Sequence, residues 1–159
     1  MVLTNYSRHW GDKLETLGSL LDKFAINKIR LDKYIAQPDR EVSKLASIEG
    51  VSVSLGREID EYLSQALTGE IPLEEPKNKL YNANYYEEQK FVSMSDVIDK
   101  LFGANLTLWN LEDQRRDKSF PDDVRLKICD EVSVVNGLRN NCMDEINKIL
   151  SELINSKNP

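Results

Sequence analysis

Long stretches of helical apolar periodicity, separated by prolines, constrain the fold of this chain most strongly. The five prolines are Pro38, Pro72, Pro76, Pro121 and Pro159, and none falls inside a periodic apolar segment. Between them, apolar residues recur at the i, i+3, i+4, i+7 spacing that places them on one helical face. Because proline breaks helix interiors, four long helices fit between these positions. We predict an all-α fold, a four-helix bundle forming a single domain over residues 1–159, with a long loop between helices two and three.

The first half of the chain predicts two helices. Helix one is expected over about residues 8–36, and helix two after Pro38, which suits a first helical position. Gly69 is a natural end for helix two. Gly50 and Gly56 interrupt this helix, and each costs about 1 kcal/mol relative to alanine. A break beside Gly56 and the close approach of a neighbouring helix both explain them; we favour close packing, because Gly56 falls on the predicted apolar face.

The second half predicts a helical hairpin. Helix three is expected to begin at Ser93, since Ser93 and Asp96 have the spacing of an N-terminal cap, and to end near Asp117. Helix four follows residues 119–122 and runs to about residue 154. A connection this short joins antiparallel neighbours. The much longer connection before helix three contains four aromatic residues, which favours its packing on the bundle.

Composition excludes several classes of function. The net charge is −6 and no basic block or stripe occurs, so neither nucleic acid nor an anionic membrane is expected as a partner. The start of the chain lacks a signal-peptide core, so we expect a cytoplasmic protein. His9 is the one histidine, which argues against a zinc site or a histidine-dependent triad, and we expect neither a metal ion nor a cofactor. Cys129 and Cys142 would lie about 20 Å apart on one helix, too far to bridge.

Several polar side chains fall on the apolar stripes of helices three and four. Asn105, Glu112 and Arg116 lie on the stripe of helix three, and Asn136 and Arg139 lie on that of helix four. Burying such groups without partners costs about 1–3 kcal/mol each, and more when they are charged. These side chains therefore need partners inside the bundle.

Spacing limits which of these groups can meet. Glu112 and Arg116 are four residues apart on one helix and can bridge each other. In a hairpin closed near residue 119, Arg139 lies about 16 Å beyond the level of Glu112, so these two should not pair. Glu49 falls on the predicted apolar face of helix two. We therefore expect Glu49 to be the partner of Arg139.

Three interpretations of these polar residues stay open. The favoured one is a structural network that fixes how the helices are arranged. The second is a pocket for a phosphate or a sugar, with Trp109 on the same face. Its candidate residues are Asn105, Trp109, Glu112, Arg116, Asn136, Arg139, Asn140 and Glu49. The third is an interface buried only in an oligomer, such as a homodimer, for which Leu111, Val134 and Leu138 lie off the main stripes.

A magnesium site is a weaker interpretation. Glu112, Asp113 and Asp117 match the clustered acids of helical nucleotide pyrophosphohydrolases only in part, because no Glu-Glu-x-x-Glu is present. Asp117 is also the expected last residue of its helix. The adjacent Asp122 and Asp123 are better explained as acids of a first helical turn, which the helix dipole favours.

Two segments have distinctive patterns: Asn-x-x-Leu-Trp-x-Leu-Glu-Asp-x-x-Arg from Asn105 to Arg116, and Asn-x-x-Arg-Asn from Asn136 to Asn140. Through these segments, residues 70–146 resemble a bacterial all-helical family of unknown function. Genes of this family lie beside cell-surface polysaccharide genes, which implies a link to sugar or nucleotide-sugar metabolism. Family members often have Asn-Asp after the arginine, whereas this chain has Asn140-Asn141, one acid fewer.

The sequence does not decide whether the protein is an enzyme. We expect a non-catalytic binding or interaction module. The alternative is an enzyme or binder that acts on a phosphorylated, sugar or nucleotide-sugar ligand in a polar pocket between helices.

Overall fold

The computed structural model describes residues 15–73 and 91–157. These residues form four α-helices, α1 (Leu17–Ile35), α2 (Val42–Thr68), α3 (Met94–Arg116) and α4 (Asp122–Asn155), and no strand. The predicted all-α, four-helix fold is therefore confirmed. Residues 1–14, 74–90 and 158–159 lie outside the described part, and with them His9, the first residues expected in helix one and most of the long connection.

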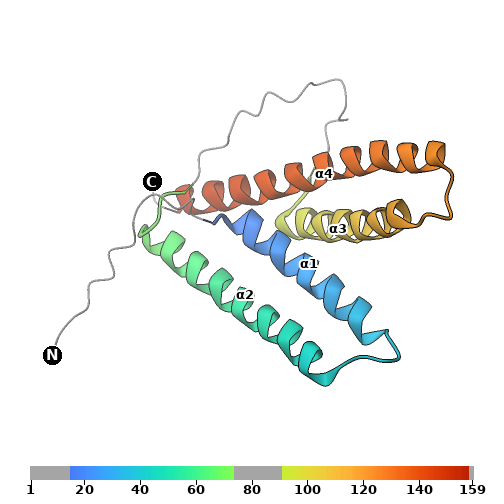
Figure 1. The fold of residues 1–159 in the computed structure, drawn as a ribbon. Helices are drawn as coiled ribbons and strands as arrows, with labels where there is room; N and C mark the ends of the chain where they lie inside the picture. Colours follow the sequence, from blue (N-terminus) through green and yellow to red (C-terminus); the bar gives the residue numbers. More distant parts are fainter. Residues whose placement is uncertain (1–14, 74–90, 158–159) are drawn as a thin grey trace.

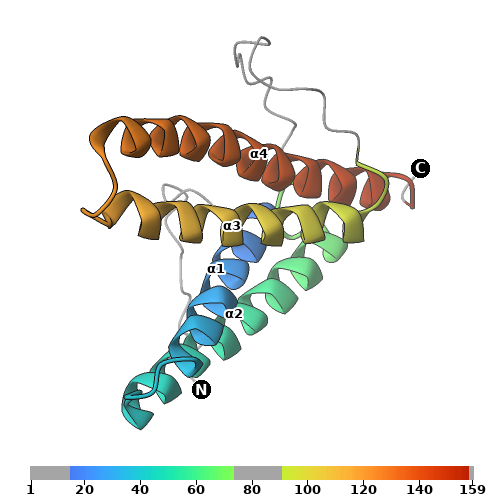
Figure 2. The same cartoon turned by 90° about the vertical axis from the view of Figure 1, so that its right-hand side faces the viewer.

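The helices are arranged as two antiparallel hairpins that cross each other (Figure 1). Helices α1 and α2 form one hairpin and α3 and α4 form the other, and their closed ends point in different directions (Figures 1 and 2). Helix α1 packs against each of the other three helices. Helix α2 lies along α1, and only its C-terminal half approaches the α3–α4 hairpin (Figure 1). The bundle is thus held together largely through α1.

The main hydrophobic core lies where the hairpins cross. It joins the start of α1, the end of α2, the start of α3 and the second half of α4. Its buried members are Leu17, Ala66, Val97, Leu101, Cys142, Ile146, Leu150 and Ile154. The largest side chains that are almost fully enclosed are Leu101, Ile146, Val97 and Cys142. Burying a side chain of this size stabilises the fold by about 1.5–3 kcal/mol, so this crossing supplies much of the driving force for folding.

Three of the predicted helix ends are confirmed. Ser93 precedes α3 and its hydroxyl accepts a hydrogen bond from the Asp96 amide at 3.2 Å. Asp117 follows the last residue of α3. Gly69 ends α2 with φ +73°, a left-handed conformation that glycine adopts without steric cost.

Two predicted helix starts are wrong. Residue 16 is not helical; Thr16 instead caps α1 in a reciprocal arrangement with Ser19. Pro38 does not begin helix two, because α2 starts at Val42 after an extended Glu41. The Thr16 cap fixes where α1 begins, whereas the apolar spacing continues into the residues before it, so spacing alone placed the start too early.

The glycines of α2 do not have the predicted role. Helix α2 is one uninterrupted helix, and a Cβ atom at Gly50 or Gly56 would meet nothing within 4 Å. Neither a break nor close packing against another described residue explains them. The close approach occurs at Gly18 of α1, where a Cβ atom would overlap the backbone of Met143 in α4. Only glycine lets these two backbones come so near.

Both cysteines are free, as expected, with Cys142 buried and Cys129 partly buried in the same helix. Burial raises the pKa of the Cys142 thiol to about 11. None of the described helices combines the length and apolar content that a membrane span requires.

Candidate functional site

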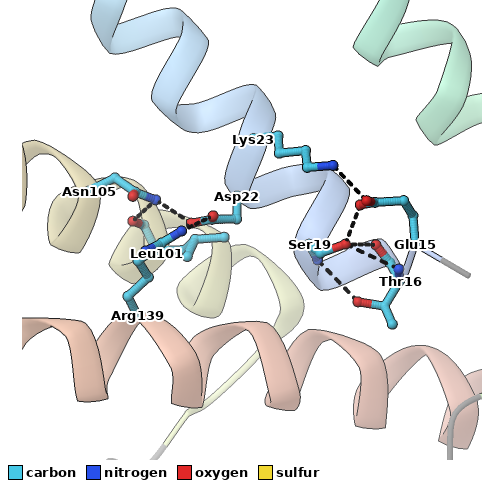
Figure 3. Close-up of polar contacts among 8 residues, drawn as sticks. All are labelled: Glu15, Thr16, Ser19, Asp22, Lys23, Leu101, Asn105 and Arg139. Carbon is cyan, nitrogen blue, oxygen red and sulfur yellow. Dashed lines mark hydrogen bonds and ion pairs between the residues drawn. The ribbon is translucent and has the colours of Figure 1, made fainter. Parts of the chain in front are cut away.

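A polar cluster with a buried carboxylate joins three helices at the crossing of the hairpins (Figure 3). Asp22 of α1 accepts two hydrogen bonds from the Arg139 guanidinium of α4, Nε to Oδ1 at 2.7 Å and Nη2 to Oδ2 at 2.5 Å. Asn105 of α3 donates its amide to the same Oδ1 at 2.8 Å and to the Leu101 carbonyl at 3.2 Å. We call Asp22, Asn105 and Arg139 the clasp.

The clasp neutralises a charge that is almost fully removed from water. Asp22 is 4% exposed and Asn105 is 5% exposed. The Arg139 side chain is 28% exposed, so part of it reaches the surface. The hydrogen bonds that Arg139 donates to Asp22 raise the pKa of Arg139 above its ordinary value, which keeps the guanidinium charged. Two parallel bonds of this kind also fix the relative orientation of α1 and α4.

Local sequence explains how α1 presents its carboxylate. Gly18, Asp22, Ala25 and Ile29 follow one another at spacings of four, three and four residues, which places them on one side of α1. All four are buried. Gly18 lets α1 approach α4 closely, and Asp22 is one turn further along. The small residues therefore bring the carboxylate within reach of Arg139.

The predicted partner of Arg139 is wrong. Arg139 pairs with Asp22 of α1, whereas Glu49 lies on the exposed side of α2. The reason is the phase of α2: its buried residues are Ile48, Ser52, Leu55 and Ala66. Val53 and Glu49 lie on a second stripe that the sequence does not distinguish from the core-facing one.

The acid and the bases at the end of α3 form a separate surface cluster. Glu112 accepts hydrogen bonds from Arg115 at 3.1 and 2.7 Å. The predicted bridge between Glu112 and Arg116 is present at 3.9 Å, but Arg116 is 73% exposed and does not face the core. Glu112 and Arg139 do not pair, as the spacing predicted.

The remaining candidates lie at intermediate depth. Trp109 on α3 and Asn136 and Asn140 on α4 are each partly buried. Of the residues proposed for a second contact surface, Leu111 is buried and Leu138 packs against the core, so only Val134 is exposed. Leu111 and Leu138 are therefore not free for a second contact surface, and the homodimer stays a prediction.

Two further polar links hold α1 in place. The Asn27 amide donates to the Ile48 carbonyl at 3.0 Å and to the Ser52 hydroxyl at 2.8 Å, which ties α1 to α2. Asn147 of α4 accepts the Gly18 amide at 2.8 Å and donates to the Thr16 hydroxyl at 3.1 Å. Together with the clasp, these links connect α1 by buried or partly buried hydrogen bonds to every other helix.

Sequence reasoning missed Asp22, Asn27 and Asn147. The signal for Asp22 was present, because Gly18, Asp22, Ala25 and Ile29 keep helical spacing. Glu49 on helix two has a similar helical position, so spacing alone did not identify Asp22 as the partner. Asn27 and Asn147 carry no sequence signal of their own, since their bonds depend on which helices become neighbours.

No group of three or more histidine, cysteine or acidic residues within residues 15–73 and 91–157 is arranged to hold a metal ion. No protein-family model, curated protein or solved structure matches the chain. The family resemblance of residues 70–146 therefore stays a prediction.

Proposed function

We propose that this protein is a non-catalytic interaction module of the cytoplasm, in which the clasp has a structural role. The observation that supports this is the use of the Asp22 carboxylate: Oδ1 accepts from both Arg139 and Asn105, and Oδ2 accepts from Arg139. A buried carboxylate engaged in this way neutralises the guanidinium and fixes the crossing of the hairpins. Because Asp22 already neutralises the positive charge of Arg139, this guanidinium attracts an anionic ligand less strongly.

The outward faces of the hairpins suit binding to other protein surfaces. Exposed large apolar side chains occur away from the core on both hairpins. They include Val42, Val53 and Leu67 on α2, Leu106 on α3, Phe120 in the connection, and Leu126 and Val134 on α4. A helix of another protein can pack against exposed apolar side chains of this kind.

The alternative function is binding of, or catalysis on, a phosphorylated, sugar or nucleotide-sugar ligand. It is favoured by the partial exposure of the Arg139 side chain and by the partly buried Asn136 and Asn140 on the same helix. The resemblance to a family linked with polysaccharide genes is the reason for testing sugar compounds.

A thermal-shift series separates the two functions. The protein is heated with inorganic phosphate, sugar phosphates, nucleotide-sugars and divalent ions, since a ligand that binds the folded state raises its melting temperature. The interaction module predicts no shift that depends on Arg139. A shift that disappears in Arg139→Met and persists in the matched surface variant Arg115→Met would overturn it in favour of the ligand site.

A positive test uses a photo-crosslinking amino acid at exposed apolar positions in cells. Adducts of defined mass are expected from Leu126 or Val53 and not from the neighbouring polar positions Lys127 or Ser54. The absence of adducts at every exposed apolar position would contradict the interaction module.

A further inference from the structure

Helix α2 carries a second stripe, with Val42, Ala46 and Val53 as its apolar members, that is largely exposed in the described chain. Val42, Ala46, Glu49, Val53, Gly56 and Asp60 follow one another at alternating spacings of four and three residues, as in one face of a two-helix coil. Val53, near the middle of this stripe, is 55% exposed. Helix α2 lies along α1 (Figures 1 and 2), and Val42, Ala46 and Glu49 are exposed on it as well. We call this second stripe the outer stripe of α2.

Two opposite charges lie symmetrically about Val53. Glu49 is four residues before it and Arg57 is four residues after it. Both are exposed, and neither forms an ion pair with another described residue. Four residues of helix span about 6 Å. In a second copy related by a two-fold axis beside Val53, Glu49 of one chain therefore lies level with Arg57 of the other, and this contact occurs twice.

The charges select the direction of the pairing. A parallel pair of α2 helices would place Glu49 beside Glu49 and Arg57 beside Arg57, which is unfavourable. The antiparallel pair places each acid beside a base. A closed two-fold dimer also uses the same surface on both chains, so no further complementary surface is needed.

The two glycines of α2 fit the same two-fold axis. Gly50 and Gly56 lie three residues before and after Val53, and a Cβ atom at either would meet nothing within 4 Å. Each glycine costs an exposed helix about 1 kcal/mol, and no close contact with another described residue requires either of them. In the antiparallel pair Gly50 lies level with Gly56 of the second copy. The absence of side chains there lets the two backbones approach.

We propose that two copies of this chain associate through the outer stripe of α2, antiparallel, with Val53 at the centre. This dimer deepens the interaction module proposed above, on which it rests, by naming the partner as a second copy. Ala46 then lies level with Asp60 of the second copy, at the hydrated end of the contact. One helix from each chain forms the interface, so its area is below that of standard stable interfaces and the dimer dissociates on dilution.

Charge reversal tests the pairing in solution. Sedimentation velocity of the full chain over a concentration series is expected to show a monomer–dimer equilibrium. Glu49→Arg alone and Arg57→Glu alone each create two like-charge contacts and weaken association at least tenfold. The double variant Glu49→Arg/Arg57→Glu restores the pairing and with it the association. Glu58→Arg, on the same helix but outside the outer stripe, leaves association unchanged.

A cysteine at the two-fold centre gives an independent measure. In a Cys129→Ser background, Val53→Cys is expected to form a disulfide-linked dimer on mild oxidation far faster than Val51→Cys, an exposed position on another side of α2. Equal rates at both positions would overturn the dimer.

A chain that remains monomeric throughout the series would also overturn it, as would a double charge reversal that fails to restore association. The interaction module would survive either result if the exposed apolar positions still formed adducts with another protein. It would fall only with an Arg139-dependent ligand shift or with the absence of adducts at all those positions.

Discussion

Asp22 and Arg139 lie 117 positions apart in the chain and form a two-bond ion pair between α1 and α4, with Asn105 of α3 bound to the same carboxylate. One carboxylate thus connects three of the four helices. The cost of desolvating this carboxylate is offset only while its partners remain, so the loss of one partner should strongly lower the stability of the fold.

Removing one partner of this pair is expected to be costly. Arg139→Met leaves the Asp22 carboxylate buried without its counter-charge, and we expect the free energy of unfolding to fall by about 2–4 kcal/mol. Urea denaturation measures this. The double variant Asp22→Leu/Arg139→Met removes both charges and should recover most of the loss. Adding Glu49→Leu instead should recover none, and Arg115→Met should cost less than about 0.5 kcal/mol. A double variant no more stable than Arg139→Met would contradict the pairing.

Gly18→Ala is expected to separate α1 from α4. The added methyl group overlaps the Met143 backbone, which cannot move aside as a flexible side chain could. Overpacking of this kind costs about 1–3 kcal/mol. The matched control is Gly103→Ala in α3, where a Cβ atom has open space and alanine favours the helix by about 1 kcal/mol. Thermal melts should therefore shift in opposite directions, and shifts of the same sign would argue against the close approach.

The Cys142 thiol predicts a loss of stability in alkali. Its pKa is about 11 in the folded protein and 9.0 ordinarily, so between these values the unfolded chain releases the thiol proton and the folded protein retains it. The folded state then binds more protons, and its stability falls as pH rises, by up to about 1.4 kcal/mol per pH unit. Below about pH 9 the thiol is protonated in both states and contributes no pH dependence.

Denaturation of wild type and Cys142→Ala from pH 7 to 11 checks this, because the titration of lysines and tyrosines is common to both. The difference in stability between the two proteins should be constant at lower pH and narrow above pH 9. Cys129→Ala serves as the control and should retain the full alkaline loss. If the stability difference between wild type and Cys142→Ala stays constant to pH 11, the Cys142 thiol ionises as readily in the folded protein as in the unfolded chain.

Substitutions of Asn27 in α1 and Ser52 in α2 are expected to have coupled effects on the free energy of unfolding. Asn27→Ala removes the donor to the Ile48 carbonyl and the Ser52 hydroxyl, both in a buried setting, and should cost about 1–3 kcal/mol. Ser52→Ala added to it should cost less than it does in wild type, since the partner is already gone. Strict additivity in this double-mutant cycle would mean that the two side chains do not interact. Asn155→Ala, at the exposed end of α4, provides the surface control.

The sequence was sufficient for the features that depend on neighbours in the chain. The number of helices, the cap at Ser93 and the glycine end at Gly69 follow from residues within one turn of each other. Burial of Asn105 followed from the phase of its helix. The separation of Glu112 from Arg139 followed from helix rise in a hairpin. All of these are local or nearly local quantities.

Contacts between the hairpins could not be read in the same way. The partner of Arg139 depends on the crossing of α1 over α4, which a parallel arrangement of helices would not produce. The buried face of α2 was predicted wrongly for a different reason. This helix has two stripes with apolar residues, and hydrophobic spacing does not determine which of them packs against α1. Glu49 is therefore predicted to face inward from the sequence, although it is exposed in the structure, as is Val53.

The position of α1 determines which parts of the molecule unfold first. Helix α1 contacts all three other helices, whereas the contribution of α2 to the main core is confined to its C-terminal half, around Ala66. The N-terminal turns of α2, near Val42, can open while the crossing stays closed, but α1 cannot leave without separating most of α2 from the α3–α4 hairpin. Backbone amides in the middle of α1 should thus exchange with solvent only when the whole chain unfolds, and those near Val42 long before.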